Sequence, residues 1–193
     1  PYTASISEIN AEDRLSKLCI KFPEYLAEWA ATSIGPFKDK SNRIYHGQYK
    51  SGKIHGIGAL LWPNETFYFG NFSNSLLHGE GVLLNPDSSY YKGSFKLGKA
   101  NGYGKLLQSD GTHYIGEFID DYKHGQGVET HPNGTVYDGE WIANFMHGYG
   151  KLVYKNEQTC YEGGFAEGVI HGTGEYIWTD GRYYVGDFCR GVR

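Results

Sequence analysis

The chain has 193 residues, of which 28 are glycine and 17 are tyrosine, and its formal net charge is −4. Collagen is excluded, because glycine does not recur at every third position and the chain has only 6 prolines. No apolar run approaches the roughly 18 residues of a membrane-spanning helix, and the modest charge argues against nucleic acid or an anionic membrane as a partner. Three cysteines without close spacing favour a reducing, intracellular compartment.

Residues 1–44 differ from the rest of the chain and predict a helical cap followed by a linker. Asn10, with acidic residues in the turn after it, is a typical helix start. An apolar stripe with helical spacing follows, interrupted by Pro23, and consists of Leu15, Leu18, Cys19, Phe22, Leu26, Trp29 and Ala30. Residues 34–43 read as a polar linker. We expect a cap over the end of the following array; the alternative is a helix that binds a partner or a second copy.

Residues 45–193 repeat with a period of 23 residues, and one step of 24 reflects an extra residue between Lys155 and Cys160. Seven tyrosines open the repeats: Tyr45, Tyr68, Tyr91, Tyr114, Tyr137, Tyr161 and Tyr184. A glycine follows two positions after each tyrosine and an aromatic residue four positions after it. A His-Gly pair and a further glycine come later in the repeat. The seventh repeat stops at Arg193, so we expect the natural chain to continue beyond it.

Each repeat predicts a β-hairpin. The tyrosine, glycine and aromatic residue alternate, so they share one face of a strand, and the glycine leaves room for a ring to lie across it. Gly, Asn and Asp dominate the first turn, where they tolerate positive φ; Ser75 is the misfit, and we expect a different turn there. Asn-Gly or Asp-Gly closes several repeats. Successive hairpins predict a long, twisted, single antiparallel sheet without a two-layer core.

The sequence predicts neither a catalytic site nor a cofactor or metal site. Neighbouring copies of the repeated histidine would lie about 10 Å apart across the sheet, which is too far for shared zinc coordination. Two segments, Gly47–Lys53 and Gly93–Lys99, resemble a phosphate-binding loop, but neither has the Ser or Thr after its lysine and neither opens a helix. No grouping of Ser, Cys and carboxylate residues is typical of an enzyme, so we expect a non-catalytic protein.

The pattern Y-x-G-x-[WF]-x-x-G-x-x-H-G-x-G at this period resembles the MORN repeat (membrane occupation and recognition nexus). The resemblance covers residues 45–193, with Asn101 in place of His and Ser75 in place of Gly as departures. It implies an all-β array, an elongated single sheet with a groove, here with a short N-terminal helical cap. Proteins of this family serve mainly as protein–protein scaffolds in cilia and other cytoskeletal structures, and lipid binding has been proposed for them.

We therefore expect a scaffold, most simply a structural component of a ciliary axoneme or another cytoskeletal assembly. Its partner would be an extended or helical segment of another protein within a larger complex. Residues 114–193 hold 12 acidic and 6 basic residues, which favours a basic segment there. The alternatives are a membrane or phosphoinositide adaptor, and a regulatory module of an enzyme whose catalytic domain lies outside this chain.

Aromatic side chains dominate the cores of protein interfaces, so the repeated rings are the candidate contact residues. They are Tyr45, Tyr68, Phe72, Tyr91, Phe95, Tyr114, Phe118, Tyr137, Trp141, Tyr161 and Phe165. The competing interpretation is that these rings form the core of the array.

Overall fold

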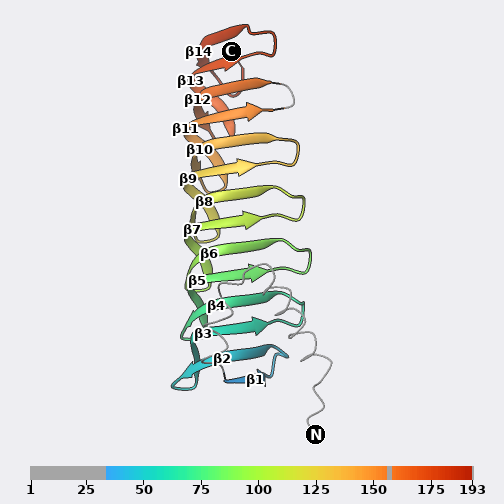
Figure 1. Cartoon of the computed structure of the whole chain (residues 1–193). Helices are drawn as coiled ribbons and strands as arrows, with labels where there is room; N and C mark the ends of the chain where they lie inside the picture. The colour runs from blue at the N-terminus through green and yellow to red at the C-terminus, as the bar shows by residue number, and fades with distance from the viewer. Residues whose placement is uncertain (1–33, 156–157, 193) are drawn as a thin grey trace. The chain divides into compact units, whose positions relative to one another are not determined.

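The computed structural model describes residues 34–155 and 158–192, and all of its regular structure is β-strand (Figure 1). Fourteen strands form one antiparallel sheet in which the spatial order follows the sequence order. The fold class is therefore the one that the repeat predicts. The predicted helical cap lies in residues 5–33, outside the described residues.

The chain divides into two compact units, residues 1–99 and 100–193. In the first unit the strands are β1 (Ile34–Lys38), β2 (Ile44–Lys50), β3 (Lys53–Leu61), β4 (Phe67–Ser73), β5 (Leu76–Leu84) and β6 (Tyr90–Lys96). Strand β7 (Lys99–Leu107) begins at the boundary. The second unit continues with β8 (His113–Ile119), β9 (Tyr122–Thr130), β10 (Thr135–Ile142), β11 (Phe145–Tyr154), β12 (Thr159–Ala166), β13 (Val169–Ile177) and β14 (Tyr183–Phe188).

Strand β1 corrects the expectation that residues 34–43 are a linker. It pairs with β2, so that Phe37 lies opposite Tyr45. The polar run between the two strands is a tight turn, because the Asp39 carboxylate accepts hydrogen bonds from the backbone N–H groups of Ser41 (2.9 Å) and Arg43 (3.0 Å). This strand lacks the Tyr-x-Gly pattern, so the repeat period could not reveal it.

The first turn of every repeat has one backbone conformation, with positive φ at two consecutive residues, as in a type I′ hairpin turn. Ser75 is no exception, since its φ is 67° and its N–H donates to the Ile54 carbonyl at 2.8 Å. Its hydroxyl also accepts from the Ile54 N–H (3.2 Å), as the Asp121 carboxylate does from the Ala100 N–H (2.7 Å). The prediction of a different turn at Ser75 is therefore wrong, because a short polar side chain can support the same geometry.

A β-bulge follows the repeat glycine in five hairpins, β2–β3, β4–β5, β8–β9, β10–β11 and β12–β13. In the β10–β11 pair Gly139 lies opposite Gly150, but the next residue, Glu140, lies opposite His147. The Glu140 carboxylate accepts a hydrogen bond from the Tyr149 N–H at 2.9 Å, and Gln48 does the same for the Ile57 N–H at 3.0 Å. Such a bulge bends its strand and increases the local twist.

Strand register divides the side chains between two faces. We call the face with the repeat tyrosines the ring face, and the other the reverse face. On the reverse face of the first unit one row of paired residues runs through His46, Ala59, Phe69, Val82 and Lys92. The matching row of the second unit runs through Lys105, Ile115, Val128, Asp138, Lys151, Glu162, Glu175 and Val185.

Candidate functional site

The ring face carries a ladder of aromatic rings in each unit. In the second unit each ring packs edge-to-face on the next, with centroids 4.9–5.3 Å apart, in the order Phe118, Tyr114, Trp141, Tyr137, Phe165, Tyr161, Phe188 and Tyr184. In the first unit the ladder runs through Phe37, Tyr49, Tyr45, Phe72, Tyr68, Phe95 and Tyr91. Such pairs add about 0.5–1.5 kcal/mol each beyond the burial of their area.

The repeat needs tyrosine rather than phenylalanine at its first position. The Tyr137 hydroxyl donates to the Glu140 carbonyl at 2.9 Å, so it satisfies a polar group that the bulge leaves inside. The same hydrogen bond, from the tyrosine to the carbonyl three residues later, forms in all seven repeats, at 2.8–3.3 Å. Desolvation raises the pKa of the Tyr137 phenol above its usual value, so the group remains a donor.

The eleven predicted contact residues therefore lie in the interior, each with 0–6% of its surface exposed. The structure brings neighbouring rings together within each unit, but it leaves a partner almost no access to them. Burial agrees with the competing interpretation of these rings as core. A direct contact between them and a partner stays a prediction that no observation tests.

One repeat replaces apolar ring-face residues with a charged pair. Lys123 and Glu129 stand where the next repeat has Met146 and Leu152, and their side chains form a buried ion pair. The Lys123 ammonium also lies 4.9 Å from the centre of the Trp141 ring. Burial lowers the pKa of Lys123 to about 8, although the Asp110 carboxylate raises it in part.

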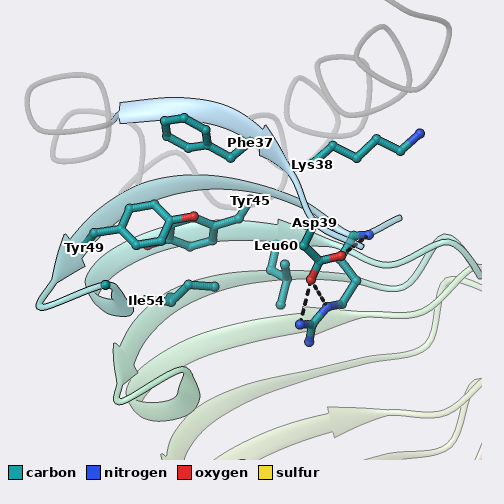
Figure 2. Close-up of a pocket in the computed structure, with 9 residues that line it drawn as sticks. Phe37, Lys38, Asp39, Tyr45, Tyr49, Ile54 and Leu60 are labelled. Carbon is teal, nitrogen blue, oxygen red and sulfur yellow. Dashed lines mark hydrogen bonds and ion pairs between the residues drawn. The ribbon is translucent and has the colours of Figure 1, made fainter. Parts of the chain in front are cut away.

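An open pocket of about 460 Å³ lies at the β1 end of the ring face (Figure 2). Phe37 and Tyr49 form its aromatic wall, with ring centroids 5.7 Å apart, and both are about half exposed. Leu60 and Ile54 also line it. Arg43 and Asp39 form an ion pair of 2.7 Å at its rim. The pocket is apolar and has no catalytic grouping of side chains.

The second unit exposes apolar side chains along its hairpin tips. We call this surface the tip ridge, and it consists of Ile119, Tyr122, Ile142, Phe145 and Val169, each 43–56% exposed. Two of its members face each other across each of two turns. Hydrogen bonds hold successive tips side by side, from the Lys123 N–H to the Asn144 side chain (2.8 Å) and from the Gly168 N–H to the Met146 carbonyl (3.0 Å).

Sequence reasoning missed the tip ridge because its positions vary between repeats. At the positions of Ile119 and Tyr122 the first repeat has Lys50 and Lys53, and the third has Lys96 and Lys99. All four of these lysines are exposed, so the first and third tips are basic, whereas the second tip has Ser73 and Leu76 at the same positions and the fourth and fifth tips are apolar. The signal that could have revealed the ridge lies in the repeat positions whose residues vary, rather than in the positions that stay constant.

The part of the chain that the structure describes offers no group of three or more His, Cys, Asp and Glu side chains arranged to hold a metal ion. Nor does any helix among these residues have the length and apolar character to cross a membrane. Cys160 and Cys189 are both free thiols.

The MORN repeat model matches six segments of the chain, residues 45–67, 68–90, 91–113, 114–136, 137–159 and 161–181. No curated protein matches the chain. Among solved structures it is similar to the SAS-4 (dCPAP) TCP domain in complex with a proline-rich motif of Ana2 (dSTIL) of Drosophila melanogaster. The identity is 12%, the match covers 68% of this chain and 72% of that chain, and the TM-score is 0.44. The family assignment therefore rests on the repeats, which span well over half of the sequence: the chain belongs to the MORN-repeat family.

Proposed function

We propose that this protein is a non-catalytic scaffold that binds another protein along the tip ridge of its second unit. The observation that carries the proposal is the exposure of five large apolar side chains in one row. Contiguous exposed apolar surface is typical of protein interaction sites, whereas scattered single residues are not. The aromatic ladder stabilises the hairpins beneath the ridge, so the ridge can keep its shape on binding.

The charges beside the ridge indicate the chemistry of the partner. Asp120, Asp121 and Glu167 lie in the turns that carry the ridge, and all three are exposed. A segment with apolar residues and lysine or arginine would therefore fit both the ridge and its margins. We infer that the partner presents a basic, amphipathic segment, either extended or helical.

We also propose a cellular setting for this scaffold. MORN-repeat proteins are typical of ciliary and other cytoskeletal assemblies, so we propose a role as a structural component of such an assembly. A tagged protein should then localise to a microtubule-based structure in the cell.

The test uses the double variant Tyr122→Ser/Phe145→Ser and a matched control, Lys53→Ser/Leu76→Ser. Both pairs stand at the same position of the repeat, so the control makes the same change at the tips of the first unit. Affinity purification followed by mass spectrometry should recover a partner with the wild type and with the control. The ridge variant should lose it at least tenfold and become diffuse in the cell, while circular dichroism stays unchanged.

Equal recovery of partners by the ridge variant and the control would contradict the ridge as the docking surface. Loss with both variants would show that tip residues of either unit matter, and would also reject a site confined to the second unit.

A second candidate function is a membrane or phosphoinositide adaptor, and one observation favours it. The exposed lysines Lys50, Lys53, Lys96 and Lys99 lie on two hairpin tips of the first unit. Basic groups near an anionic bilayer gain about 1 kcal/mol each. Flotation with phosphoinositide vesicles at low salt tests this. Binding that falls when the four lysines become serine would support the adaptor, and the absence of flotation would reject it.

A further inference from the structure

The reverse face of the first unit carries a buried apolar cluster. Its members are Ile44, Ala59, Leu61, Phe67, Phe69 and Val82, each with at most 8% of its surface exposed, and Ile57 and Leu84 pack against it. The ring face of the same strands is buried as well, beneath its own aromatic ladder. At these positions both faces of β2–β5 are therefore shielded from solvent, although the described strands form only one layer.

The hairpins themselves do not bury this face. Val82 and Val128 are the same residue at the same position of the repeat, yet Val82 is 0% exposed in the first unit and Val128 is 37% exposed in the second. Ile115, which stands at the position of Phe69, is also 37% exposed. A sheet buries a face only against another layer, so the first unit needs a cover that the second unit lacks.

We propose that residues 5–33 of this chain form that cover, as helices packed on the apolar cluster. This segment reaches the sheet at Ile34, the first residue of β1, and β1 pairs with the strand that holds Ile44. It also carries the predicted apolar stripe from Leu15 to Ala30. The four strands of the cluster span about 14 Å, from three spacings of about 4.8 Å, and a helix of ten residues is about 15 Å long.

The charge on the reverse face confines the cover to the first unit. The paired row that holds Phe69 and Val82 ends with Lys92, and the matching row of the second unit includes Asp138, Lys151, Glu162 and Glu175. Lys151 and Glu162 form an exposed ion pair of 3.0 Å. Burying such charges beneath an apolar helix is unfavourable, because they would lose their hydration. This proposal concerns a different face and unit from the tip ridge, so either can fail without the other.

Three cysteines allow a test within one molecule. Cys19 belongs to the predicted stripe, whereas Cys189 lies in the described part of the chain and is exposed. We expect iodoacetamide at pH 8, with mass spectrometry of the native protein, to alkylate Cys19 at least ten times more slowly than Cys189. Equal rates for the two thiols would overturn the proposal.

Matched variants connect this protection to the cluster. Phe69→Asp should raise the alkylation rate of Cys19 to that of Cys189, while Ile115→Asp, the same position two repeats later, should leave it unchanged. Circular dichroism and an unchanged rate at Cys160 show whether the array is still folded. Leu18→Asp spares the strands altogether and should expose Cys19 in the same way, so protection that persists in this variant would overturn the proposal even where Phe69→Asp fails to fold.

A second copy of the chain is the other possible source of a cover in the purified protein. Intramolecular packing predicts that the rate at Cys19 does not change on hundredfold dilution. A rate that rises on dilution would assign the cover to a second copy and reject packing within one chain.

Discussion

Two glycines face each other beneath a tyrosine ring in five of the repeats, as Gly139 and Gly150 do beneath Tyr137. A methyl group added to Gly150 would lie 2.5 Å from the Tyr137 hydroxyl oxygen, closer than real contacts allow. Its backbone is not in the left-handed region, so Gly150 is required for space. Gly181 is glycine for the opposite reason: its φ is 82° and nothing lies within 4 Å of an added methyl group.

These two requirements can be separated by a double-mutant cycle with Tyr137→Leu. We expect Gly150→Ala to lower stability by about 1–3 kcal/mol through overpacking, and a smaller ring-face residue at position 137 to recover part of that loss. The coupling free energy should exceed about 1 kcal/mol for Gly150, but stay within about 0.5 kcal/mol for Gly181→Ala. Urea unfolding followed by circular dichroism measures both. Additive effects at Gly150 would contradict the proposed contact.

At the scale of the element, the fourth repeat is the exception on the ring face. Its Lys123–Glu129 pair occupies positions that are apolar in every other complete repeat. His131 lies 3.2 Å from Glu129, and its other ring nitrogen lies 3.2 Å from the Thr112 hydroxyl, so the pair belongs to a small polar network. Replacing a buried ion pair by well-packed apolar residues is often neutral or stabilising.

We therefore expect the double variant Lys123→Met/Glu129→Leu, which copies the fifth repeat, to be as stable as the wild type or more stable by up to about 4 kcal/mol. Lys123→Met alone leaves a buried carboxylate without its cation and should destabilise the protein by about 3–5 kcal/mol. Thermal unfolding of the three proteins decides the matter. If the double variant were the least stable, the pair would be a net stabilising interaction.

For the whole molecule, the sequence period predicts the fold almost completely. The hairpins, the positive φ of the first turns and the pairing of each tyrosine with its glycines all follow from constant positions such as Tyr137 and Gly139. Strand β1 does not follow, because it is held by an Asp39 turn that has no copy of the motif. The sequence also does not predict whether the rings are buried, because their burial depends on how far each bulge bends its hairpin.

The surface of the molecule is less predictable, since it lies in positions that differ between the units. The tips change from Lys53 in the first unit to Tyr122 in the second, and the reverse face changes from Phe69 to Asp138. A search for self-similarity averages over these differences. One type of hairpin thus forms two units with different surfaces, and the candidate interaction sites lie at repeat positions whose residues differ between the units.

The longer fifth repeat shows where such an array tolerates a change of length. Its extra residue falls between Lys155 and Thr159, in the turn that closes the repeat. The rings on either side keep their spacing, because the centroid of the Phe165 ring lies 4.9 Å from that of Tyr137 and 5.2 Å from that of Tyr161. The spacing of the rings in the ladder therefore does not depend on the length of the closing turn. In genetic terms, an in-frame duplication or deletion of one whole repeat keeps every tyrosine on the ring face, and so does a small insertion in a closing turn. An insertion of an odd number of residues within a strand instead moves a tyrosine to the reverse face. Arrays of this kind can thus evolve by unequal recombination between their own repeats.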